Sequence, residues 1–117
     1  MHKENQATTD ISQFFAGNIE PEIGDHLYVI MKRYIHHGLY IGDGKVIHYL
    51  QSRVSEDTLS IFAKTAKIRI YPIADSPVEF DAEQIIERAK SRISENNFQK
   101  FGTDCEKFVR WSRCDQC

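Results

Sequence analysis

A glycine-aspartate-glycine turn between two runs of β-forming residues is the feature that most restricts how this chain can fold. Gly42-Asp43-Gly44 separates residues 35–41 from residues 45–50, and short glycine-containing connections between such runs are typical of β-hairpins. A further run of this kind, residues 26–31, follows a turn at Gly24-Asp25. We therefore expect an antiparallel meander of at least three strands.

The region after the hairpin predicts smaller elements. Residues 58–64 are typical of a short helix. Residues 66–73 alternate apolar and polar side chains, as a half-buried strand does. Pro72 cannot donate to a sheet ladder, so this strand is expected to end there or to lie at a sheet edge.

The pattern then changes to a helical period. Asp81 and Gln84 fit a capping box at the start of one amphipathic helix, and residues 104–113 predict a second. The predicted fold class is α+β, an antiparallel meander sheet packed against C-terminal helices. Residues 1–20 are expected to form a polar segment with a short apolar patch, and residues 21–117 the folded domain.

Composition narrows the class of partner. The 117 residues carry 15 Lys and Arg against 17 Asp and Glu, a net charge of −2, which disfavours nucleic acid as the main ligand. The N-terminus has no apolar signal-peptide core, and no stretch approaches the roughly 18 apolar residues of a membrane span. We expect a cytoplasmic protein without a transmembrane anchor, and no metal or other cofactor.

The three cysteines fall in the last part of the chain, at Cys105, Cys114 and Cys117. Three cysteines cannot all pair within one chain, and so far from the core they could not brace it, so thiols are expected. Cys114 and Cys117 form a C-x-x-C pair, but no second ligand pair at metal spacing accompanies it, which disfavours a zinc site.

Cys105 is expected in the first turn of the last helix. Thr103 and Glu106 fit a capping box around it, with Asp104 as an alternative cap. Unpaired amide groups and the positive end of the helix dipole stabilise a thiolate at such a position. A cysteine on an apolar helix face is, however, more often a small core residue.

The register of the hairpin decides whether two of its histidines cooperate. A two-residue loop would pair His48 with Leu39 and turn it away from His36. A three-residue loop, with Gly44 left-handed in a bulge, would pair His48 with Gly38 and place it on the face of His36. The apolar pattern favours the second register, because Ile35, Leu39 and Ile41 then share a largely apolar face with Lys45, Ile47 and Tyr49.

The second register brings together the side chains of a nucleophilic site. His36 and His48 would lie diagonally on one face, and Cys105 could approach them from the helix start. This set corresponds to a base, a group that orients the base, and a nucleophile. His37 points to the opposite face and is assigned no chemistry.

These segments resemble a known family. Tyr34 to Tyr49, YIHHGLYIGDGKVIHY, resembles the H-box of the lecithin retinol acyltransferase family, and residues 104–109, DCEKFV, resemble its N-C-E-H-F-V motif. Gly24-Asp25 is similar to the G-D that opens the first strand in that family. The resemblance covers roughly residues 21–111.

The resemblance implies a fold, a reaction and a set of site residues. The fold would be a circularly permuted papain-like fold of the NlpC type. Cys105 would attack a lipid or other ester and form a thioester, with His36 as its base and His48 orienting that base. Tyr34 would help to form the oxyanion site.

Two positions depart from the family pattern and leave other functions open. Asp104 replaces the asparagine, and its charge should raise the pKa of the thiol unless it is used to cap the helix. Lys107 replaces the histidine two residues after Cys105 and partly offsets that charge. The competing hypotheses are a papain-like peptidase or amidase, and a catalytically silent binding module that keeps the motifs for structure.

Overall fold

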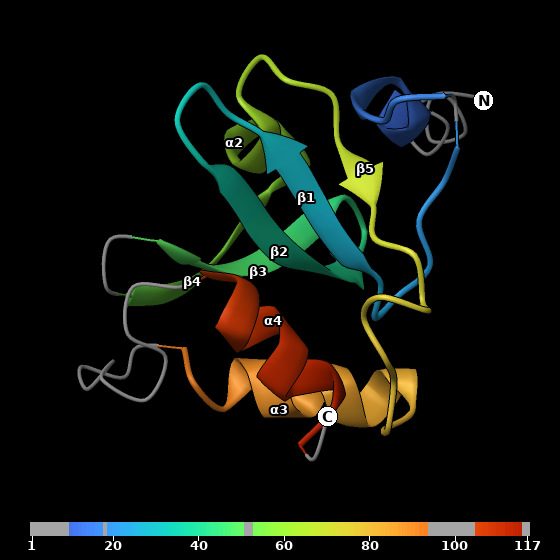
Figure 1. The fold of residues 1–117 in the computed structure, drawn as a ribbon, viewed down its shortest axis with the longest axis vertical. Coiled ribbons are helices and arrows are strands. Elements are labelled where there is room, and N and C mark those ends of the chain that lie inside the picture. Colours follow the sequence, from blue (N-terminus) through green and yellow to red (C-terminus); the bar gives the residue numbers. More distant parts are fainter. Residues whose placement is uncertain (1–9, 18, 51–52, 94–104, 116–117) are drawn as a thin grey trace, which may run out of the picture.

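The computed structural model describes residues 10–17, 19–50, 53–93 and 105–115. A five-stranded antiparallel sheet forms its centre, in the order β4-β3-β2-β1-β5 (Figure 1). The strands are β1 (His26–Ile30), β2 (Ile35–Gly42), β3 (Lys45–Leu50), β4 (Arg53–Thr58) and β5 (Arg69–Ile70). The helices are the 3-10 helix η1 (Asp10–Phe14), α2 (Leu59–Ala63), α3 (Ala82–Lys90) and α4 (Cys105–Arg113). The predicted α+β class is confirmed.

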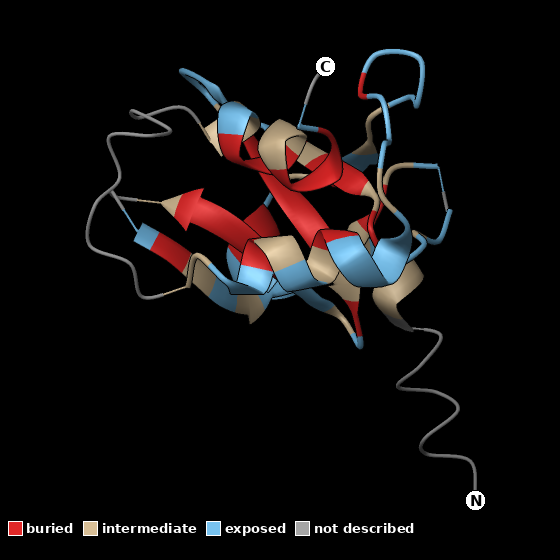
Figure 2. Ribbon diagram, turned by 90° about the horizontal axis from the view of Figure 1, so that it is seen from below, coloured by how far each residue is buried: buried red, intermediate tan, exposed pale blue. Residues whose placement is uncertain are grey.

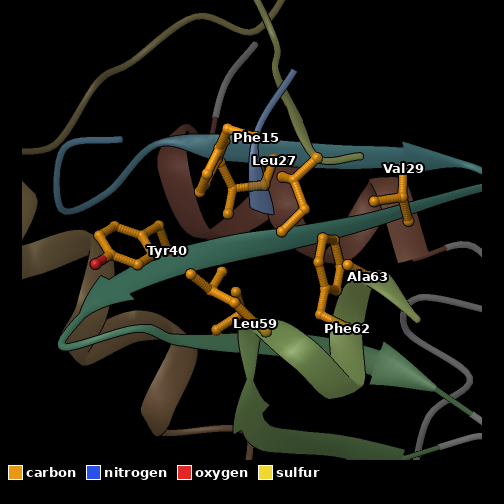
Figure 3. Close-up of a cluster of buried hydrophobic side chains, with 9 residues drawn as sticks. Phe15, Leu27, Val29, Tyr40, Leu59, Phe62 and Ala63 are labelled. Carbon is orange, nitrogen blue, oxygen red and sulfur yellow. The ribbon is translucent and has the colours of Figure 1, made fainter. Parts of the chain in front are cut away.

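The sheet is covered on both faces, and each face has its own apolar cluster. Successive residues of a strand point to opposite faces, so Leu39 and Tyr40 of β2 enter different clusters. Figure 3 shows the cluster beside α2, where Phe62 rises from the helix toward β2. The other cluster packs the sheet against α3 and α4, and Figure 2 shows buried residues along the strands and on the inner sides of the helices.

The β2–β3 hairpin has the register that the apolar pattern predicted. Gly38 pairs with His48, and Gly44 has a positive φ of 71°. The extra residue does not lie at Gly44, however. The ladder is irregular between Tyr40 and Gly42, while the two residues after Gly42 form the turn. The bulge therefore precedes the turn, and the expected three-residue loop is wrong in this detail.

Two elements differ from the sequence-based expectation. Strand β4 was not predicted, because Val54 is its one buried side chain in an otherwise polar segment. Of the strand expected over residues 66–73, only Arg69–Ile70 pairs with β1, at the outer edge of the sheet, while Ile68 forms an isolated bridge with Phe15. The capping box of Asp81 and Gln84 on α3 is confirmed.

Helix α4 is attached to the sheet by a buried arginine near its C-terminal end. Arg113 is only 4% exposed, and its guanidinium donates to the carbonyl oxygens of Gly24 at 2.5 Å and Ser76 at 2.7 Å. Burial lowers the pKa of this group, although Asp25 opposes the effect. The carbonyl groups before β1 and after β5 thus fix the position of α4.

Gly38 is required by close packing. A Cβ atom at this position would lie 2.6 Å from Cε1 of Phe62. We expect Gly38→Ala to lower the free energy of unfolding by about 1–3 kcal/mol, as overpacking does. Urea unfolding of the single variants and of Gly38→Ala/Phe62→Leu would measure the coupling, and the smaller leucine should relieve part of the loss. Strictly additive effects would contradict this contact.

Candidate active site

Cys105, the first residue of α4, reaches β2 where β2 and β3 separate. The ladder between these strands ends at Gly38. Beyond it, the amide of His37 donates a hydrogen bond to Sγ of Cys105 at 3.3 Å, and the thiol lies 3.8 Å from the carbonyl oxygen of Ile35. The sulfur is in no disulfide and contacts the peptide groups on both sides of His36.

The rings of His36 and His48 form a hydrogen-bonded chain that continues to a carboxylate. Nε2 of His36 lies 2.8 Å from Nδ1 of His48, and Nε2 of His48 lies 2.7 Å from Oδ2 of Asp57 on β4. The hydroxyl of Ser55 donates to the same carboxylate oxygen at 3.2 Å. The expectation that His36 and His48 share a face is confirmed, and Asp57 is a third member that we did not predict.

The ring of His36 is held in its neutral form. Burial lowers the pKa of His36 from its usual 6.5 to about 4, and the charges of His48, His37 and Lys64 act in the same direction. Its Nδ1 makes no hydrogen bond within the part of the chain that the structure describes. The hydrogen bond expected between this ring and Cys105 is not among the described contacts. The sulfur contacts the main chain of β2 instead.

A second histidine chain lies on the opposite face of β2. Nδ1 of His37 lies 2.8 Å from Nε2 of His26, whose Nδ1 lies 2.7 Å from the hydroxyl of Ser76. On its other side, Nε2 of His37 lies 3.7 Å from Glu106, the residue after the thiol. Arg110 holds the same glutamate at 2.7 Å. His37, to which we assigned no chemistry, therefore helps to position the first turn of α4.

The two residues predicted to support the site have different outcomes. Tyr34 is half exposed, and its ring meets that of His36 edge-on with the centroids 6.2 Å apart. Asp104 lies outside the described residues, so its predicted role as a cap or as an opposing charge stays a prediction.

The remaining expectations concern the other cysteines, metals and membranes. Cys114 is disulfide-bonded, so the expected thiol at this position is wrong: the odd cysteine count excluded complete pairing but not one disulfide. Among the described residues, no group of three or more His, Cys, Asp or Glu side chains could hold a metal ion. None of the described helices combines the length and apolar character of a membrane span.

Sequence reasoning missed Asp57 because it missed the strand that carries it. Aspartate is disfavoured in strands, and β4 buries a single apolar residue, so neither propensity nor periodicity marked it. The contact between His26 and His37 carried a clearer signal. These two residues lie diagonally in the β1–β2 pairing, which the length of the connecting loop could have indicated.

An α+β domain with a cysteine at a helix start, close to a histidine chain that ends in a carboxylate, has the groups of a thiol-dependent enzyme site. The family model described as lecithin retinol acyltransferase matches residues 19–117. The chain therefore belongs to the lecithin retinol acyltransferase family, which associates it with acyltransferase chemistry and acyl or lipid substrates. A search of curated proteins found no match. The circular permutation implied by the resemblance stays a prediction.

The buried histidine His26 should make the fold sensitive to acid. Burial, with the charges of His37, Arg113 and Arg110, lowers its pKa from 6.5 to about 2. Below pH 6.5 the unfolded chain therefore binds a proton that the folded chain excludes, so the free energy of unfolding decreases as the pH is lowered. We expect the titration of His26 to lower the free energy of unfolding by about 2 kcal/mol when the pH is lowered from 6.5 to 5. Urea unfolding across this range measures the loss.

The variant His26→Gln provides the control for this pH dependence. It keeps a polar side chain and removes the titrating ring, so its unfolding free energy should vary less between pH 6.5 and pH 5. Parallel curves for the two proteins would show that His26 is not the source.

Proposed function

We propose that this protein is a cysteine-dependent acyltransferase or hydrolase that forms a thioester with Cys105. The observation that carries the proposal is the position of this thiol, at the first residue of α4 and against the two peptide groups that flank His36. In the proposed reaction His36 is the base, and His48 orients it through the 2.8 Å contact between their rings.

The first half of the reaction transfers the acyl group to the enzyme. Nδ1 of His36 takes the thiol proton of Cys105, and the thiolate attacks the carbonyl carbon of the ester. A carbon–sulfur bond forms and the carbon–oxygen bond of the ester breaks. The departing alcohol takes the proton from His36, which leaves the thioester.

The second half returns the enzyme to its starting state. Water, an amine or an alcohol gives a proton to His36 and attacks the thioester carbonyl, and the sulfur leaves as thiolate. The product is a carboxylic acid, an amide or an ester, respectively. The proton on His36 returns to Cys105 at the end of the cycle. This chemistry requires a reduced thiol at Cys105. We propose that the protein acts in the cytoplasm, whose reducing conditions would maintain that thiol, although the disulfide of Cys114 is uncommon in that compartment.

The start of α4 supplies electrostatic support for this chemistry. Its first-turn amides and helix dipole favour negative charge on Cys105. The amide of His37 also donates to the sulfur at 3.3 Å, and such a bond is stronger to a thiolate than to a thiol. The hydroxyl of Tyr34 is the donor that we propose for the oxyanion, because its ring lies beside that of His36.

Exposed apolar side chains beside the thiol support an acyl substrate. Ile30 and Ile35 form the last pair of β1 and β2 and are 55% and 47% exposed, next to the half-exposed Tyr34. The carbonyl oxygen of Ile35 is the group that lies 3.8 Å from the sulfur of Cys105. An acyl chain bound along this pair would bring its carbonyl carbon to the thiol.

Intact-protein mass spectrometry tests the covalent step. After exposure to activated esters or phospholipids, the protein should gain the mass of the acyl group on Cys105, and hydroxylamine should remove it. Cys105→Ser should gain no thioester, and His36→Gln should acylate at least ten-fold more slowly, as loss of a general base predicts. Acylation by amides but not esters would favour a peptidase. No adduct with any substrate would favour the silent module.

The apolar pair should govern preference for the acyl chain. Ile30→Thr/Ile35→Thr keeps β-branched residues in the hairpin but removes apolar contact. We expect kcat/KM for a long-chain ester to fall roughly ten-fold relative to an acetyl ester, since partial burial of two such side chains is worth about 1–2 kcal/mol. Ile73→Thr, at another exposed isoleucine, is the control. Equal losses on both esters would contradict this substrate site.

A further inference from the structure

We infer that Asp57 is a positioning residue, which fixes the tautomers of His48 and His36 so that Nδ1 of His36 is left unprotonated to receive the proton of Cys105. The inference rests on the proposed function for its consequence in catalysis. The arrangement of tautomers can be tested without any substrate.

The position of Asp57 follows from the pairing of β3 with β4. His48 pairs with Ser55, and Val46 pairs with Asp57, so all four side chains lie on one face. Asp57 is the diagonal neighbour of His48, and its Oδ2 lies 2.7 Å from Nε2. Ser55 donates to the same oxygen at 3.2 Å and so helps to hold the carboxylate in place.

The carboxylate determines which nitrogen atoms carry protons. An ionised carboxylate can only accept hydrogen bonds, so Nε2 of His48 must be the donor to Asp57. When His48 carries a single proton, the state to which the inference applies, its Nδ1 is then the acceptor, and it can accept only from a protonated Nε2 of His36. Because the lowered pKa of His36 keeps its ring neutral, its single proton is on Nε2. Its Nδ1 therefore has an available lone pair.

Among the residues that the structure describes, none makes a competing hydrogen bond to either ring that would set the opposite tautomers. The contacts that Phe62 and Tyr34 make with His36 are ring contacts, and Phe62 also packs edge-on against His48. The charge of Lys64, and those of His48 and His37 when these rings are protonated, all disfavour protonation of His36. Among the described residues, Asp57 is thus the negatively charged group that is hydrogen-bonded to the His36–His48 pair.

Nitrogen-15 NMR of labelled histidine tests the inference directly. In the wild-type protein near pH 7, we expect a protonated Nε2 and an unprotonated Nδ1 for His36. In Asp57→Asn the amide can also donate to Nε2 of His48, which favours the opposite tautomers. We expect a protonated Nδ1 to appear on His36 and iodoacetamide alkylation of Cys105 to slow at least ten-fold near pH 7, an effect of the kind known for a mispositioned catalytic histidine.

Glu56→Gln is the matched control, since it removes a carboxylate from the same strand at a residue that pairs with Lys45 at 3.8 Å instead. It should leave the histidine spectrum and the alkylation rate unchanged. A wild-type His36 protonated at Nδ1 would overturn the inference, whether or not Asp57→Asn folds. Unaltered tautomers in a folded Asp57→Asn would also overturn it. An unreactive Cys105 with the expected tautomers would instead count against the proposed function alone.

Discussion

The pairing of Gly38 with His48 is the contact on which both the core and the candidate site depend. It places Tyr40 and Val46 in the cluster beside α2 and leaves the alternate residues for α3 and α4. A slip of one residue would turn His48 to the other face and bury the wrong side chains on both. Gly38 also leaves the space that Phe62 fills between the strand and α2. The same pairing thus sets the packing and joins His48 to His36.

Two consecutive residues of β2 have different tasks because a strand presents alternate side chains to opposite faces. His36 points toward α2 and enters the chain to His48. His37 points toward α4 and contacts Glu106, which follows the thiol. Because the amide of His37 also bonds the sulfur, this short stretch of backbone holds both the candidate base and the candidate nucleophile. The site is therefore built across the strand and not on one face of the sheet.

The sequence was sufficient where a local pattern carries the structure. The glycines of the hairpin, the apolar alternation around Leu39 and the capping box of α3 each predicted an element that is present. It was insufficient where stability comes from pairing alone. Strand β4 has one buried apolar residue, and its place is fixed by hydrogen bonding to β3. Asp57 could not be recognised before that pairing was known.

The same reasoning explains the limits of the prediction for the thiol. Helix capping and the apolar stripe placed Cys105 at the start of α4 and toward the sheet, as observed. The pattern could not show that the β2–β3 ladder ends at Gly38 and leaves the amide of His37 for the sulfur. Where two paired strands separate is decided by the whole sheet, so no local window reports it.

The carboxylate at the end of the histidine chain lies where its charge is least costly. His48 is 1% exposed, whereas the side chain of Asp57 on the edge strand is 29% exposed. A fully buried carboxylate would lose much of its hydration and tend to bind a proton, after which it could donate a hydrogen bond as well as accept one. Partial exposure keeps water near the charge, while Ser55 and the ring of His48 fix its direction. The edge position of β4 leaves most of its side chains partly exposed to water. This exposure suits the carboxylate of Asp57, and it also removes the apolar pattern by which a strand is recognised from sequence.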